Sequence, residues 1–98
     1  MQRDPALRDA VKADLARIFG RLAGCMSPAR LAVRLQVDEA KPAHLLRGRL
    51  GIFSIERLMY FLTLLGHDIE IVVTPAPREN GQRVRHGTVR VIDDAEPI

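Results

Sequence analysis

Basic and imidazole side chains are spaced three residues apart from Lys41 to Arg47, and Arg49 follows across a glycine. On a helix this spacing places Lys41, His44 and Arg47 near one face. Their N–H groups can donate hydrogen bonds to the base edges and phosphates of DNA. We expect Lys41 and His44 to approach base edges, and Arg47 and Arg49 to neutralise phosphates. The alternative is that all four are ordinary solvent-facing side chains.

Two further groups extend this candidate surface. Arg30 lies in the preceding helical pattern and would also neutralise a phosphate. Ser54 begins a later helix, and the unpaired backbone N–H groups at a helix start can bind phosphate. The predicted DNA contacts are therefore Arg30, Lys41, His44, Arg47, Arg49 and Ser54.

The stretch 26–48 has to position these side chains, and its pattern predicts two short helices joined by a tight turn. Ser27 is a good N-cap, and Pro28 suits the first helical position. Asp38 can cap the second helix, and Gly48 can end it in the left-handed conformation. Such a pair forms a helix-turn-helix, whose second helix lies in the DNA major groove. Small helical bundles with other functions also contain such pairs.

Two more helices flank this pair. The first begins at Asp4-Pro5 and ends at Gly24, and the last begins after Ser54 and ends at Gly66. Each has one face that is apolar at the three- and four-residue spacing of a helical core. These core positions are Leu7, Val11, Leu15, Ile18 and Leu22 in the first helix and Leu58, Phe61, Leu62 and Leu65 in the last.

After His67 the pattern changes to the alternation that is typical of β-strands. Residues 68–74 and 83–92 both alternate, and the turn or linker between them contains the tight-turn pair Asn80-Gly81. A lone strand leaves unpaired backbone groups on both edges, so it must pair with the other segment, a second subunit or both. We therefore expect a homodimer whose interface includes Ile69, Ile71, Val73, Val89 and Val91.

The length of 98 residues suits one small domain. We place a helix-turn-helix domain with a terminal strand at 1–74, and a linker, possible second strand and acidic tail at 75–98. The net charge is +3, but the first 92 residues carry +6, because three acids lie in the last six residues. A basic body suits a polyanionic partner. The tail 93–98 has no packing signal, and we expect it to be mobile.

Several classes of protein find no support in the sequence. No apolar run is long enough to cross a membrane and no signal peptide opens the chain, so we expect no membrane partner and a cytoplasmic location. The single cysteine, Cys25, excludes an internal disulfide, and we interpret it as a small core residue. No phosphate loop, nucleophile–base pair or metal-ligand spacing is present, so we expect neither enzymatic activity nor a cofactor.

Three motifs carry a family resemblance: L-L-R-G-R-L at 45–50, F-S-I-E-R-L at 53–58 and L-G-H-D-I-E-I-V-V at 65–73. In this order they resemble the Xre-type helix-turn-helix antitoxins of bacterial type II toxin–antitoxin systems, in the HigA-like branch. The resemblance covers about residues 7–75. It implies a bundle of four or five helices that dimerises, binds its own operator and neutralises a RelE/HigB-like ribonuclease toxin.

The sequence departs from this family within the helix pair. Gln36 replaces the usual turn glycine, and Met26-Ser27-Pro28 stands where members commonly have Leu-Thr-Gln. This second change removes a glutamine that usually meets the DNA backbone in the family.

The second helix departs further. Pro42 cannot donate a backbone hydrogen bond, so we expect the helix to start at or just before it, with 38–41 as an irregular turn. Asp38 and Glu39 add negative charge where phosphates would approach.

The expected fold is therefore mainly α, with four to five helices, a helix-turn-helix and one or two C-terminal β-strands that pair at a dimer interface. The expected function is a repressor that binds double-stranded operator DNA and serves as the antitoxin of a toxin protein. The alternative is a protein-interaction module derived from a helix-turn-helix, with weak or lost DNA binding.

Overall fold

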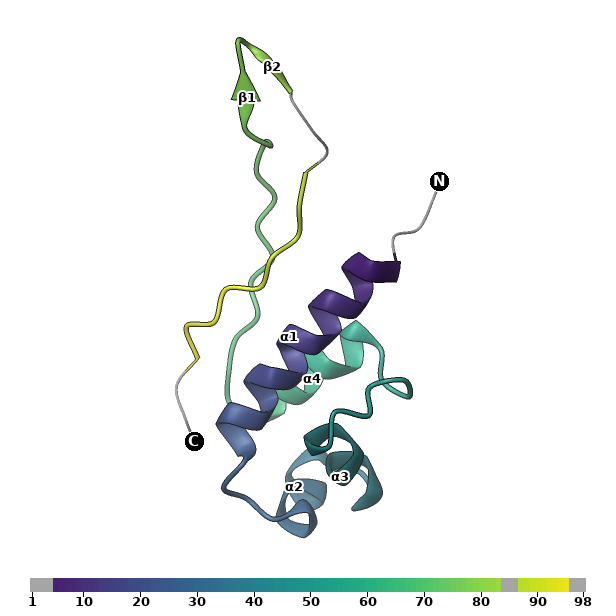
Figure 1. The fold of residues 1–98 in the computed structure, drawn as a ribbon. Coiled ribbons are helices and arrows are strands. Elements are labelled where there is room, and N and C mark those ends of the chain that lie inside the picture. Colours follow the sequence, from purple (N-terminus) through teal and green to yellow (C-terminus); the bar gives the residue numbers. More distant parts are fainter. Residues whose placement is uncertain (1–4, 84–86, 96–98) are drawn as a thin grey trace.

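Four helices form the body of the molecule, and a narrow hairpin extends away from it (Figure 1). The structure is a computed structural model and describes residues 5–83 and 87–95. The expectation of a mainly helical fold with four helices is confirmed. None of the described helices is long and apolar enough to cross a membrane. In chain order the elements are α1 Pro5–Ala23, α2 Pro28–Leu35, α3 Ala40–Leu46, α4 Ile55–Leu64, β1 Arg78–Glu79 and β2 Gln82–Arg83.

Serine caps determine where α2 and α4 begin. Ser27 Oγ accepts a hydrogen bond from the Arg30 N–H at 3.2 Å, and Ser54 Oγ accepts one from the Arg57 N–H at 3.1 Å. Each bond satisfies one of the N–H groups that the start of a helix leaves without a partner. Both predicted caps are confirmed.

Three helices end in the same backbone motif, in which the residue after the last turn is left-handed. Gly48 has φ 76° and donates to the Leu45 carbonyl at 3.1 Å, and Gly66 has φ 87° and donates to the Thr63 carbonyl at 3.0 Å. Both predicted ends are confirmed. After α2 the same position is held by Gln36 at φ 59°, a conformation that costs a residue with a Cβ about 1–2 kcal/mol.

Helices α1 and α4 pack side by side and enclose the aromatic centre of the core (Figure 1). The ring centroid of Phe61 on α4 lies 6.4 Å from that of Phe19 on α1 and 6.0 Å from that of Phe53. Most predicted core positions are buried, but Leu7 is exposed and Val11 is half-buried. The predicted start at Pro5 and end before Gly24 hold for α1, and Asp4, its predicted cap, lies outside the described residues.

Residues 67–95, which we call the arm, run from the end of α4 to the hairpin and back to the body (Figure 1). Strands β1 and β2 pair antiparallel around Asn80 and Gly81, whose φ values are 53° and 78°. Positive φ at both central residues is typical of the two-residue turn that matches strand twist. The predicted tight turn is confirmed.

The longer strands predicted at 68–74 and 83–92 do not form within this chain. Residues 67–77 and 87–95 contain no strand, and 84–86 lie outside the described residues. Pro75 and Pro77 have no N–H to donate, so they interrupt any continuation of the ladder from β1 toward the body. The only strands among the described residues are the two short ones at the hairpin tip. Pairing of the arm with a second chain stays a prediction.

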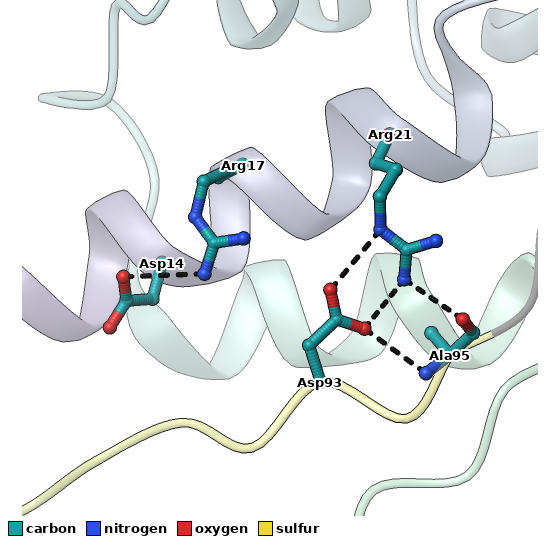
Figure 2. Close-up of polar contacts among 5 residues, drawn as sticks. All are labelled: Asp14, Arg17, Arg21, Asp93 and Ala95. Carbon is teal, nitrogen blue, oxygen red and sulfur yellow. Dashed lines mark hydrogen bonds and ion pairs between the residues drawn. The ribbon is translucent and has the colours of Figure 1, made fainter.

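A bidentate ion pair attaches the end of the arm to α1 (Figure 2). Arg21 donates from Nη2 and Nε to the two carboxylate oxygens of Asp93 at 2.6 and 3.2 Å, and from Nη2 to the Ala95 carbonyl at 2.9 Å. Residues 93–95 therefore contact the body, although the sequence showed no packing signal there, while 96–98 lie outside the described residues.

Val91 is half-buried and packs with Ala95 against the core of its own chain, and its place at a dimer interface stays a prediction. The prediction that Cys25 is a small core residue is wrong, because Cys25 is exposed. It lies just after α1, in the short connection to α2, which the core does not cover.

Candidate nucleic-acid interface

Helices α2 and α3 pack against each other at the end of the body that lies away from the hairpin (Figure 1). Their facing sides bury Leu31 and Leu35 of α2 and Leu45 of α3. Four residues, 36–39, separate the two helices. Because the leucines fix how α3 lies on the body, its opposite side faces solvent. The predicted helix-turn-helix is confirmed.

The start of α3 shows how the chain accommodates a proline there. Asp38 Oδ1 accepts a hydrogen bond from the Ala40 N–H at 3.0 Å, but the residue at the cap position is Glu39, one position after the predicted Asp38, and its side chain makes no cap hydrogen bond. The helix begins at Ala40, so the expected irregular turn over 38–41 is shorter than predicted. Pro42 lies in the first turn, where backbone N–H groups have no partner within the helix, and its ring is fully buried. The proline therefore costs α3 no hydrogen bond and contributes to the core.

The six predicted contact residues fall into two groups. Lys41 and His44 are half-buried, so α3 presents them less openly than their helical spacing predicted. His44 Nδ1 is buried and has no hydrogen-bond partner among the described residues. The exposed group is Arg30, Arg47, Arg49 and Ser54.

Several arginines surround the helix pair, and some of them are already engaged within the chain. Arg34 Nε donates to the Leu64 carbonyl of α4 at 3.2 Å, and the Arg57 guanidinium lies 5.4 Å from the centroid of the Phe61 ring. These two side chains connect elements of the body. Of the arginines around the helix pair, three have no such side-chain contact among the described residues: Arg30, Arg47 and Arg49. Their charges remain available to an external anion.

The connection 47–54 between α3 and α4 is fixed at two points. Lys12 Nζ donates to the Leu50 carbonyl at 3.4 Å, and the Phe53 N–H donates to the same carbonyl at 3.0 Å. Phe53 is buried in the core. Arg49 therefore projects from an anchored connection rather than from a loose loop. The Lys12 contact spans 38 positions in the chain, so no local pattern could have predicted it.

The charge around the helix pair is positive but not uniform. Residues 27–57 contain six basic and three acidic side chains. Two of the acids, Asp38 and Glu39, are exposed at the start of α3, and Glu56 is exposed in the first turn of α4. Positive charge is therefore concentrated after α3, at Arg47 and Arg49, rather than at its start.

The sequence of residues 11–74 matches the family described as helix-turn-helix domain. The chain belongs to this helix-turn-helix domain family. The matched region includes all four helices from the second turn of α1 onward and ends before the hairpin. No match to a curated protein was found.

A solved structure supports the same placement. It is described as a member of the XRE family of transcriptional regulators and is 29% identical to this helix-turn-helix protein. The likeness covers 92% of this chain and 99% of that chain, with a TM-score of 0.83. Because so little of either chain is left out, the likeness extends beyond the helix-turn-helix domain into the arm.

Proposed function

We propose that this protein is a transcriptional regulator that binds double-stranded operator DNA through the α2–α3 end of its body. The helix-turn-helix family and the XRE-family neighbour support a DNA-binding transcriptional regulator. The observation that carries the proposal to particular residues is the set of unengaged arginines there: Arg30, Arg47 and Arg49. Phosphate contacts supply most of the sequence-independent affinity of such proteins.

The exposure of these residues decides which of them we assign to phosphates and which to bases. Arg47 and Arg49 flank the end of α3 and are free to reach phosphates. Lys41 and His44 remain the candidates for base contacts, but their half-burial leaves them little reach into a groove. We therefore expect phosphate contacts to dominate affinity, with modest discrimination among sequences.

The test is a DNA-binding titration over a range of salt concentrations. A labelled duplex from the region upstream of the coding sequence is compared with a random duplex of equal length. Arg47→Ala and Arg49→Ala should each weaken binding to both duplexes to a similar extent and lower the salt slope by about one unit. Arg8→Ala is the matched control, because Arg8 is exposed on α1 before the matched domain begins.

Two outcomes would count against this assignment. A change in preference at a single base pair would mean that the arginine reads bases rather than phosphates. Equal losses for Arg8→Ala and Arg47→Ala would mean that binding follows net charge alone and that no surface is specific to the α2–α3 end.

We further propose that the regulator is the antitoxin of a type II toxin–antitoxin pair. The support is the sequence resemblance at 45–50, 53–58 and 65–73. It predicts a RelE/HigB-like ribonuclease encoded beside this chain, which the chain binds and inhibits while repressing its own operon. Co-expression should yield a stable complex and suppress the ribonuclease activity of the partner. An active partner that ignores an excess of this chain would contradict the proposal.

A second candidate function is an interaction module with weak or lost DNA binding. The exposed acids Asp38 and Glu39 at the start of α3 favour it, because phosphates would approach there. Under this alternative the chain co-purifies with its protein partner but shows no salt-dependent affinity for either duplex. Asp38→Asn with Glu39→Gln would strengthen DNA binding if these acids are what weakens it.

A further inference from the structure

We propose that Lys12 on α1 is a positioning residue for DNA binding, because it holds the connection 47–54 from which Arg49 reaches a phosphate. The inference rests on the proposed assignment of Arg49 to the DNA backbone. It adds to the DNA-binding machinery a side chain from α1, a helix that we assign no contact with DNA.

Lys12 differs from the other basic residues of its helix. It is half-buried, whereas the other three are exposed: Arg8, Arg17 and Arg21. Its ammonium group makes no ion pair among the described residues, and its hydrogen bond goes to the Leu50 carbonyl at 3.4 Å. Moving an ammonium out of water costs free energy, which a single carbonyl offsets only in part. An apolar side chain would cover this part of the body without that cost, so the contact with the connection best explains a lysine here.

The connection 47–54 contains no helix or strand that could hold it in place. Gly48 and Gly51 lie close to Arg49 on either side, and glycine restricts the backbone less than any other residue. The direction in which Arg49 projects therefore depends on the contacts that the backbone of the connection makes with the rest of the body.

The Leu50 carbonyl is the point where those contacts meet. It accepts hydrogen bonds from Lys12 Nζ and from the Phe53 N–H, and the Phe53 ring lies in the core. Leu50 directly follows Arg49, and the Arg49 N–H donates to the His44 carbonyl of α3 at 2.9 Å. The backbone is thus held on both sides of Arg49, by α3 before it and by α1 and the core after it.

A held backbone strengthens the contact that a long side chain makes with a phosphate. An arginine on a loose connection loses backbone freedom as well as side-chain freedom when it binds. When the connection is ordered before DNA arrives, only the side chain remains to be ordered. Loss of the Lys12 anchor should therefore weaken DNA binding although the Arg49 guanidinium is still present.

The first measurement is amide hydrogen exchange in the free protein, which does not depend on DNA. Lys12→Met keeps an apolar stem of similar length but removes the ammonium. The Phe53 N–H should exchange about 5-fold faster in this variant, while amides of the α1–α4 core keep their protection. Lys12→Arg keeps a cationic donor, and its exchange should stay close to that of the wild type.

The second measurement is a DNA titration of the single and double variants. Lys12→Met should weaken binding to the upstream and random duplexes alike, because a phosphate contact carries no sequence information. Arg49→Ala should weaken binding by about 10-fold in the wild type, but by about 3-fold or less when residue 12 is methionine. The two changes remove one shared interaction, so their effects should not multiply. Lys12→Arg should restore most of the affinity.

Two controls separate positioning from charge. Arg8 lies one helical turn before Lys12 on α1, so Arg8→Ala removes a positive charge from the same side of the helix. It should leave the Phe53 exchange rate and the effect of Arg49→Ala unchanged. Arg30 is a phosphate candidate on α2, outside the connection, so the effects of Arg30→Ala and Lys12→Met should multiply.

Four outcomes would overturn the inference. An unchanged Phe53 exchange rate in Lys12→Met would show that the ammonium does not hold the connection. Faster exchange with unchanged duplex affinity, where Arg49→Ala does weaken binding, would show that the anchor serves the fold alone. Effects of Lys12→Met and Arg49→Ala that multiply in full would mean that Lys12 acts through its charge. An Arg49→Ala variant that binds like the wild type would contradict the phosphate assignment itself, and this inference with it.

Discussion

The body, residues 5–66, and the arm, residues 67–95, are both rich in apolar residues. The body buries most of its apolar side chains, whereas the arm leaves most of its own exposed. The body buries three phenylalanines and a set of leucines in one core. The arm leaves Ile71, Val72 and Val73 largely exposed. A helix satisfies its own backbone and needs only one covered face, whereas a strand needs a neighbour for its backbone as well. Within one chain the body therefore satisfies both needs, whereas the described residues 68–77 make no backbone–backbone hydrogen bond.

The largest expected effect separates the two regions by truncating one apolar side chain in each. Phe61→Ala removes a ring that contacts Phe19 and Phe53, and should lower the free energy of unfolding by about 3–5 kcal/mol. Val73→Ala should change it by less than about 0.5 kcal/mol, because Val73 is 92% exposed. Urea unfolding followed by circular dichroism measures both. A comparable loss for Val73→Ala would show that Val73 is covered in solution.

The same contrast explains what the sequence could and could not predict. Ser27, Ser54, Gly48 and Gly66 were identifiable as helix starts and ends because their partners lie within five residues in the chain. The strands at 68–74 and 83–92 were predicted from alternation, but alternation does not say which chain supplies the neighbour. Residues 67–77 and 87–95 form no strand within this chain, so the predicted pairing of these segments stays untested.

In the candidate site, too, the features that depend on local sequence were predictable and those that depend on packing were not. The exposure of Arg30, Arg47 and Arg49 follows from their place on the surface of short helices and turns, and was predicted. The half-burial of Lys41 and His44 depends on how α3 lies against the body, which helical spacing alone does not contain. The Arg21–Asp93 pair joins positions 72 residues apart, and its two members carry no local signal of each other.

A smaller effect tests whether helix ends in the body are decided locally. Gln36 is left-handed at φ 59°, so Gln36→Gly should stabilise the protein by about 1 kcal/mol. Gly48→Ala should destabilise it by a similar amount of about 1 kcal/mol, through the backbone alone. A Cβ at Gly48 would meet no atom within 4 Å, so no steric clash contributes. Thermal or urea unfolding of the pair measures both changes. If Gln36→Gly is destabilising, the Gln36 side chain makes a contribution that outweighs its backbone strain.

The smallest effect concerns the ion pair that joins the far end of the arm to α1. The hydrogen bonds from the Arg21 guanidinium, and then that from the Ala95 N–H, hold the pKa of the Asp93 carboxyl below its ordinary value of 3.8. A carboxyl whose pKa is lower in the folded chain stabilises the fold fully above pH 3.8, and this contribution is lost as the pH falls through the lowered pKa. At neutral pH the arm should therefore stay attached to α1 and loosen only in acid.

Substitution should reproduce that loosening at neutral pH. Asp93→Asn removes the charge, so backbone amides of 87–95 should exchange with solvent faster, while those of the α1–α4 core keep their protection. Asp94→Asn is the matched control, because Asp94 is the next residue, is exposed and makes no ion pair among the described residues. Equal exchange rates in the wild type and Asp93→Asn would mean that Val91 and Ala95 hold the arm by packing alone. Apolar burial alone would then attach the arm to the body, and the Arg21–Asp93 ion pair would add nothing to that attachment.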